Sequence, residues 1–284
     1  MEKAGHIFSA WDKLAKTLRG KFLYIFLDYD GTLASIAESP EKAVISERTA
    51  GLLRELSGMP ERKIAIISGR GLKDVMKKAG LKKLTYAGNH GLEIKGPGVK
   101  VLKAVPAKYK RALTRLKGVL VKKLSSIEGA FLEDKNFSVT VHYRQVAKKD
   151  IPGVKAVLRE ALDVPGVSDA VKVRSAKMAV EIRPPVEWDK GRAVLLLLSR
   201  QKAKLAGKKR KIIPIYAGDD ATDEDAFRAL RSVGVTISVG NKEGTSAEYF
   251  LKDTDEVEIL LRKILDLGIA ARGSHSGRKV RKGH

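Results

Sequence analysis

Residues 22–33, FLYIFLDYDGTL, set the architecture of this chain. Six apolar or aromatic residues in a row lead directly into Asp28 and Asp30, which are two positions apart. A short, uniformly apolar run is typical of a strand that is buried on both faces of a parallel sheet. The two acids therefore stand at the end of a buried strand, and Gly31 permits a tight turn immediately after them.

Short apolar runs of the same kind recur along the chain and alternate with helical stretches. The expected strands lie at 22–27, 63–67, 84–87, 212–217 and 234–239, and the expected helices at 46–57, 71–79, 189–204 and 222–230. This alternation predicts an α/β fold with a doubly wound, Rossmann-like parallel sheet. In such sheets, ligands bind at the carboxyl ends of the strands.

Residues 96–186 interrupt this alternation and predict a second domain inserted into the first. The expected elements are a basic helix at 105–124, strands at 129–134 and 136–144, a helix at 150–162, and strands at 170–174 and 177–183. The order αββαββ predicts an α+β domain with an open antiparallel sheet. The core domain would then comprise 1–95 and 187–270, followed by a basic, disordered tail at 271–284.

Composition narrows the classes of protein. The 284 residues include no cysteine, which excludes disulfides and cysteine-based zinc sites and fits a cytoplasmic location. No apolar run reaches the roughly 18 residues of a membrane span, so we expect no membrane partner. The net charge of +23 is spread widely along the chain, with two dense acid-free runs at 200–211 and 271–284. A basic nucleic-acid-binding protein is therefore the non-enzymatic alternative, although neither run has the interleaved aromatic residues that stack on bases.

Polar residues follow the predicted strands of the core domain or open its helices. They are Asp28 and Asp30; Ser68, Gly69 and Arg70; Lys190; and Asp219, Asp220 and Asp223. The topology would bring these ends to one rim, where crowded carboxylates need a cation between them. Oxygen-rich sites of this kind suit Mg²⁺ together with a substrate phosphate. Ser68 and Lys190 would supply the donor and the positive charge that a phosphate needs.

The two acids of the first strand have a chemical explanation. One carboxylate can attack phosphorus as a nucleophile and form an acyl-phosphate. A second carboxylate, two residues further along an extended chain, points the same way. It can protonate the leaving oxygen and later take a proton from water. The two acids therefore suit a division in which one attacks phosphorus and the other moves protons.

In order along the chain, DYDGTL, SGR, the lysine of WDKGRA and GDDATDED resemble the four motifs of the haloacid dehalogenase-like phosphohydrolases. The resemblance implies that Asp28 is the nucleophile and that Asp30 is the acid/base. It implies that Ser68 and Lys190 hold the phosphoryl group. The implied ligands of Mg²⁺ are Asp28, the backbone carbonyl of Asp30, Asp219, and Asp220 and Asp223 either directly or through water.

The inserted strands predict one buried and one polar face. Ser138, Thr140, His142 and Arg144 share one face of NFSVTVHYR (136–144), and Lys177, Glu181 and Arg183 share one face of KMAVEIRP (177–184). Such a face suits a polyhydroxylated ligand, and a plain solvated face is the alternative. The domain also resembles, by its position between the second and third motifs, the cap of one branch of the superfamily.

Within that branch, GNHGLEI (88–94), VHYR (141–144), KMAVEIRP and GDDATDED resemble the trehalose-6-phosphate phosphatases. The substrate contacts we expect are Gly69, Arg70, His90, Glu93, His142, Arg144, Lys177 and Glu181. The implied reaction is Mg²⁺-dependent hydrolysis of trehalose 6-phosphate through an aspartyl-phosphate. A phosphatase acting on sucrose phosphate or a glycosyl-phosphoglycerate is the alternative. The oligomeric state is open, with a monomer favoured.

Overall fold

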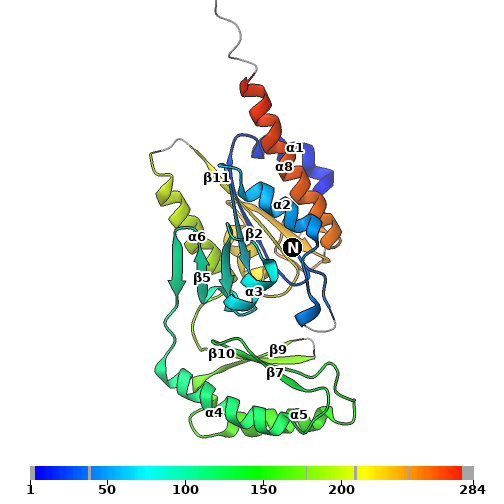
Figure 1. Ribbon diagram of the computed structural model, residues 1–284, viewed down its shortest axis with the longest axis vertical. Helices are drawn as coiled ribbons and strands as arrows, with labels where there is room; N and C mark the ends of the chain where they lie inside the picture. Colours follow the sequence, from blue (N-terminus) through cyan, green and yellow to red (C-terminus); the bar gives the residue numbers. More distant parts are fainter. Residues whose placement is uncertain (1–3, 38–39, 177, 208–209, 242, 277–284) are drawn as a thin grey trace, which may run out of the picture. The chain divides into compact units, whose positions relative to one another are not determined.

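The computed structural model describes residues 4–37, 40–176, 178–207, 210–241 and 243–276. The chain divides into two compact units (Figure 1). The first comprises Met1–Val101 and Trp188–His284, and the second comprises Leu102–Glu187. Each unit is described by itself below.

The first unit contains a sheet of nine strands among the described residues. In spatial order they are β1 (Gly5–His6), β13 (Tyr249–Leu251), β12 (Val235–Val239), β11 (Ile212–Gly218), β2 (Phe22–Leu27), β3 (Arg62–Ile67), β4 (Thr85–Gly88), β5 (Glu93–Gly96) and β6 (Val99–Leu102). The pairs from β1 to β4 are parallel, and β5 is antiparallel to β4. The strand that carries Asp28, β2, therefore lies in the interior of the sheet.

Helices cover both faces of this sheet (Figure 1). The helices of the first unit are α1 (Trp11–Leu18), α2 (Glu47–Ser57), α3 (Leu72–Ala79), α6 (Lys190–Lys204), α7 (Glu224–Leu230) and α8 (Thr254–Ser276). Alternate residues of β2 belong to two cores. Leu23 and Ile25 pack in the core formed with α1, α2, α3 and α8, whereas Tyr24 and Phe26 pack with α6 and α7. This burial on both sides explains why β2 is apolar throughout.

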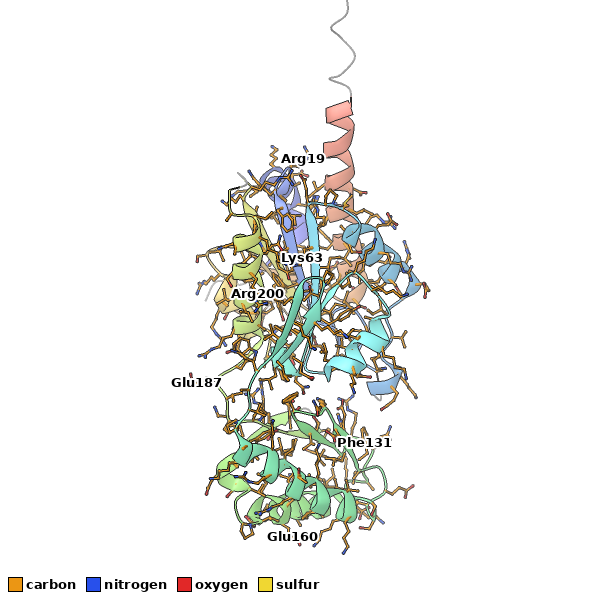
Figure 2. The ribbon with its side chains drawn as sticks, turned by 60° about the vertical axis from the view of Figure 1, so that its left-hand side comes forward. Arg19, Lys63, Phe131, Glu160, Glu187 and Arg200 are labelled. Atoms are coloured by element: carbon orange, nitrogen blue, oxygen red, sulfur yellow. The ribbon has the colours of Figure 1, made fainter. Side chains whose placement is uncertain are left out.

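The second unit is a four-stranded antiparallel sheet with two helices. Along the chain its elements are α4 (Ala107–Leu124), β7 (Phe131–Asp134), β8 (Val139–His142), α5 (Ile151–Asp163), β9 (Lys172–Ala176) and β10 (Ala179–Arg183). The strands lie in the order β7-β8-β10-β9. Val139, Val141 and Ile182 are buried with residues of α4 and α5, which lie side by side along one face of the sheet (Figure 2).

These elements confirm the predicted α/β class and the αββαββ order of the insertion. Three features differ from expectation. The turn at 95–98 joins β5 to β6 within the first unit, so the second unit begins at Leu102 rather than at 96. Helix α8 was not predicted, and it continues to Ser276, where we expected a disordered tail from 271. Residues 277–284 of that tail lie outside the described residues.

Short 3₁₀ turns occur at Ile7–Ala10, Pro40–Lys42, Asn89–Gly91 and Ser168–Ala170. Within the described ranges, no helix is both long enough and apolar enough to cross a membrane.

Helix α6 offers a direct test of this packing. Leu197 is 2% exposed in the core with Phe26, whereas Leu195 on the same helix is 43% exposed. Leu197→Ala should lower the free energy of unfolding by about 2–4 kcal/mol, because it leaves a cavity. Leu195→Ala, the matched control, should cost less than about 1 kcal/mol. Urea denaturation of both variants measures the difference, and equal losses would mean that α6 does not bury this face.

Candidate active site

A buried lysine joins two carboxylates at the carboxyl end of the sheet. Asp28 directly follows β2, and its N–H donates to the carbonyl of Ala217 on β11 at 2.9 Å. Lys190 is the first residue of α6 and is 2% exposed. Its Nζ donates to Oδ1 of Asp28 and to Oδ1 of Asp223, both at 2.8 Å. The first, third and fourth predicted motifs therefore meet at one ammonium group.

The loop after β11 holds its three acids in different ways. Asp220 Oδ1 accepts from the N–H and the hydroxyl of Thr222, which closes the turn. Asp223 is fully buried, and its Oδ1 also accepts from the hydroxyl of Tyr216 at 2.5 Å. In the described part of the chain, Oδ1 of Asp219 is buried and accepts no hydrogen bond. Of the three, Asp219 has the oxygen most in need of a partner.

These carboxylates fit a metal ion. Asp28, Asp219 and Asp223 each offer an oxygen within 4.8 Å of the others. Burial, which Lys190 only partly offsets, raises the pKa of Asp28 well above its usual range. Burial and the charges of Asp223 and Asp220 raise the pKa of Asp219 to about 7. A cation among these oxygens would relieve both the repulsion and the orphaned acceptor on Asp219.

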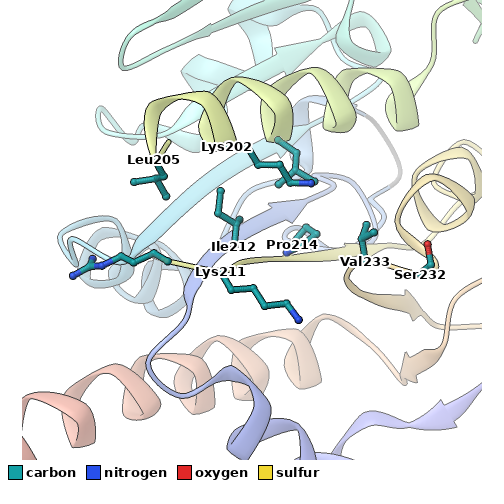
Figure 3. A pocket seen from close by; sticks show the side chains of 9 residues that line it. Lys202, Leu205, Lys211, Ile212, Pro214, Ser232 and Val233 are labelled. Carbon is teal, nitrogen blue, oxygen red and sulfur yellow. The ribbon is translucent and has the colours of Figure 1, made fainter. Parts of the chain in front are cut away.

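The approach to Asp219 depends on the glycine of the first motif. Gly31 has φ = 79°, and a Cβ there would lie 2.1 Å from Oδ2 of Asp219. Beside them is a hollow of about 460 Å³, whose lining includes Gly31, Asp219 and Lys252. A second hollow, of about 530 Å³, lies at the opposite end of β11, where Ile212 begins the strand (Figure 3). None of the acids that follow the other end of β11 lines this second hollow.

The second motif is locked to the loop that follows β4. Ser68 Oγ accepts from the N–H of Arg70 at 3.1 Å, which leaves its hydroxyl hydrogen available to a ligand. The N–H groups of Asn89 and His90 donate to the carbonyls of Arg70 and Ser68 at 2.7 and 2.9 Å. The structure therefore places His90 beside the predicted phosphate-binding serine.

Two further predicted substrate residues belong to the same pair of loops. A Cβ on Gly69 would lie 2.8 Å from Cε1 of His90, so the glycine lets the imidazole ring lie against the backbone. Glu93 accepts from Nδ2 of Asn89 at 2.9 Å, and it opens β5. Asn89 and His90 both have positive φ, at 50° and 55°, a left-handed conformation that is uncommon outside glycine.

Arg70 contacts acids of the protein. Its Nε and one terminal nitrogen donate to both oxygens of Asp30, at 2.7 and 2.6 Å, and its other terminal nitrogen donates to Asp74 at 2.8 Å. The Arg70 side chain is 6% exposed. In the structure, the predicted substrate-binding arginine is therefore the partner of the predicted acid/base. A bidentate guanidinium fixes the direction of a carboxylate more tightly than a single bond.

In the second unit, the predicted residues of the polar face are only partly brought together. His142 Nε2 lies 2.8 Å from Oε2 of Glu133, and its ring stacks on Phe131. Glu181 lies opposite Thr140 and is 3.9 Å from Nζ of Lys135. Arg144 is exposed in the turn beyond β8, because the strand ends at His142 rather than at 144. Lys177 lies outside the described residues.

Four residues of these clusters were missed from the sequence. Tyr216 and Asp74 look like ordinary core and surface residues until the fold places them beside Asp223 and Arg70. Of Glu133 and Lys135, the sequence contained a signal for Glu133. Pairing the expected strands at 129–134 and 136–144 in antiparallel register would have put Glu133 on the same face as Thr140 and His142.

Comparison with known proteins decides the family. Residues 26–255 match the family model described as trehalose-phosphatase. This chain belongs to the trehalose-phosphatase family. It is 36% identical over 282 residues to the trehalose 6-phosphate phosphatase RA3 of Zea mays, covering 93% of this chain and 75% of that protein. The resemblance read from the motifs is confirmed, and the chain is a phosphatase.

Solved structures agree on the fold of this trehalose-phosphatase family member. A trehalose-6-phosphate phosphatase related protein superposes with a TM-score of 0.72 at 27% identity, covering 87% of this chain and 99% of that one. The C-terminal domain of the Candida albicans trehalose-6-phosphate phosphatase gives a TM-score of 0.76 at 23% identity, covering 94% and 99%. The second likeness shows the fold alone.

The buried lysine gives a prediction about stability. Lys190→Met should lower the free energy of unfolding by about 3–5 kcal/mol, because it leaves Asp28 and Asp223 buried without their counter-charge. The double variant Lys190→Met, Asp223→Asn should recover part of that loss, since one uncompensated charge is removed. Urea denaturation with a chelator present measures both.

Lys252→Met is the matched control, because Lys252 is 69% exposed, and it should change stability by less than about 0.5 kcal/mol. A double variant no more stable than Lys190→Met would show that charge imbalance is not the cause.

Proposed function

We propose that this phosphatase hydrolyses trehalose 6-phosphate to trehalose and phosphate, with Mg²⁺ and through an aspartyl-phosphate. One observation carries the chemistry: the Asp28 carboxylate is held at the end of an interior strand by the buried ammonium of Lys190. The family of the chain and the name of its maize relative support the choice of substrate. The same site could serve a phosphatase of sucrose phosphate or a glycosyl-phosphoglycerate.

In the first step, the carboxylate of Asp28 attacks phosphorus and forms an O–P bond. Oδ1 of Asp28 accepts from Lys190, which leaves the other oxygen to attack. The bond between phosphorus and the sugar oxygen breaks, and Asp30 gives its proton to that oxygen. Because both oxygens of Asp30 accept from Arg70, this pair must open before the proton can move. Lys190 and the Ser68 hydroxyl offset the charge on the phosphoryl oxygens.

In the second step, Asp30 takes a proton from water, and the water oxygen attacks phosphorus. The bond between Asp28 and phosphorus breaks, and phosphate leaves with the carboxylate restored. Each carboxylate therefore returns to its starting state after one turnover. The two-residue spacing of Asp28 and Asp30 suits this division between attack and proton transfer.

The acidic cluster supports Mg²⁺ as the cofactor. Asp28 and Asp219 are the best direct carboxylate ligands, and the backbone carbonyl of Asp30 is a third candidate. Asp220 and Asp223 have oxygens that already accept hydrogen bonds, and they suit contact through water. When bound, the ion would neutralise charge on the phosphoryl group and reduce repulsion between that group and the carboxylates.

The second unit supports recognition of a sugar. Glu133, His142 and Glu181 lie on neighbouring strands of one sheet face, and they offer acceptors and donors suited to hydroxyl groups. Lys177 stays a predicted contact. The cytoplasmic location and the monomer also stay predictions from the sequence.

A substrate panel tests the proposed specificity. We expect phosphate release from trehalose 6-phosphate with kcat/KM at least about tenfold above sucrose 6-phosphate and glucosyl-phosphoglycerate, since a site that hydrogen-bonds specific hydroxyls rejects analogues that lack them. Chelation should abolish release, and added Mg²⁺ should restore it. Preference for another sugar phosphate would show that trehalose 6-phosphate is not the preferred substrate. Full activity in chelator would show that the reaction needs no metal ion.

Replacing the nucleophile tests the mechanism. Asp28→Asn should lower kcat by at least about 10³-fold, because a carboxamide cannot form the acyl-phosphate. Circular dichroism should show that the variant keeps its fold, because Asp223 still pairs with Lys190. Asp12→Asn, at an exposed position of α1, is the control and should keep full activity. Substantial turnover by Asp28→Asn would rule out this aspartate as the nucleophile.

A further inference from the structure

We infer that Tyr216 is a positioning residue of the phosphatase site, which acts through Asp223 to set how firmly Lys190 is held. The inference rests on the proposed function and deepens it. Tyr216 lies on β11, and none of the four motifs includes it. Its hydroxyl donates to Oδ1 of Asp223 at 2.5 Å.

Tyr216 and Lys190 share one acceptor atom. Oδ1 of Asp223 accepts from both the Tyr216 hydroxyl and the Lys190 ammonium, while Oδ2 accepts from the N–H of Asp220 at 3.1 Å. Two donors on one oxygen divide its negative charge, so the hydroxyl weakens the hold of Asp223 on the ammonium. More of the Lys190 charge is then directed to Asp28 and, during the reaction, to the phosphoryl oxygens.

Asp223 does not cap the helix that it precedes. It occupies the N-cap position of α7, where an aspartate usually accepts from the first N–H groups of its own helix. Here its side chain makes no such bond. The carboxylate instead lies against β11, where a Cβ on Gly218 would come within 2.2 Å of its Cγ. Because Gly218 has no side chain, the strand leaves room for the Asp223 carboxylate.

The ring of Tyr216 is held independently of its hydroxyl. It is fully buried and packs edge-on against Phe227 of α7, with ring centroids 5.7 Å apart. Tyr216→Phe therefore removes the hydrogen bond and keeps the packing. Asp223 then has one donor fewer on Oδ1 and holds Lys190 more firmly, which reduces the assistance that Lys190 gives to the reaction.

The kinetic test compares Tyr216→Phe with a matched control. We expect kcat for trehalose 6-phosphate to fall about tenfold, a size typical of one charge-assisted hydrogen bond, with KM changed less than about twofold. The control is Tyr86→Phe, which removes another buried hydroxyl of the same sheet, one that donates to the carbonyl of Leu81. It should leave kcat unchanged. Equal kcat in parent and Tyr216→Phe would overturn the inference, as would equal losses in both variants.

A double-mutant cycle shows whether Tyr216 acts through Asp223. In the Asp223→Asn background, Tyr216→Phe should lower kcat by less than about twofold, because the charged acceptor that both donors share is gone. An undiminished tenfold loss there would mean that Tyr216 acts by another route and would overturn the inference. Melting temperatures of the four proteins, measured with and without Mg²⁺, separate misfolding from lost turnover.

The two proposals fail in different ways. If the parent protein releases no phosphate from any sugar phosphate, the proposed function fails. If the parent is active and Tyr216→Phe has full activity, the proposed function stands and the positioning role of Tyr216 is wrong.

Discussion

The ammonium of Lys190, buried between Asp28 and Asp223, is the interaction on which the site depends. An unpaired charge at 2% exposure would be too costly to retain, so the two carboxylates and the lysine require one another. Burial alone would lower the pKa of Lys190, but Asp223 and Asp28 raise it well above its usual range. The lysine therefore stays charged, and its charge brings α6, β2 and the loop after β11 together; on the proposed function, this is where a phosphoryl group would meet it.

The architecture of the core could be predicted from the sequence, because strands buried in a parallel sheet are short and uniformly apolar. The run at 22–27 coincides with β2, and the runs at 63–67 and 212–217 differ from β3 and β11 by one residue each. The motifs were equally visible, since polar residues directly after apolar strands are conspicuous. Strand ends of a parallel sheet share one edge, so Asp28, Lys190 and Asp223 could be expected together before any coordinates were known.

Contacts that depend on side-chain direction could not be predicted in the same way. Arg70 was expected to face the substrate, yet the turn after β3 directs it to Asp30 and Asp74. No local pattern distinguishes these choices, because an arginine fork suits a phosphate and a carboxylate equally well. The hairpin of β5 and β6 was missed for a related reason: glycine and proline at 95–98 signal a turn, but they do not say whether the sheet continues beyond it.

On the proposed function, chemistry and selectivity are divided between residues of the two units. The groups gathered around Lys190 in the first unit, which include Asp28 and Asp223, are complementary to a phosphoryl group and a cation, which every phosphate ester shares. Discrimination among sugars needs hydrogen-bonding groups matched to hydroxyls, because a buried polar group left unpaired is costly. Glu133, His142 and Glu181 of the second unit are groups of that kind. On the proposed function, changes in the second unit would alter which sugar phosphate is hydrolysed while the reaction itself stays the same.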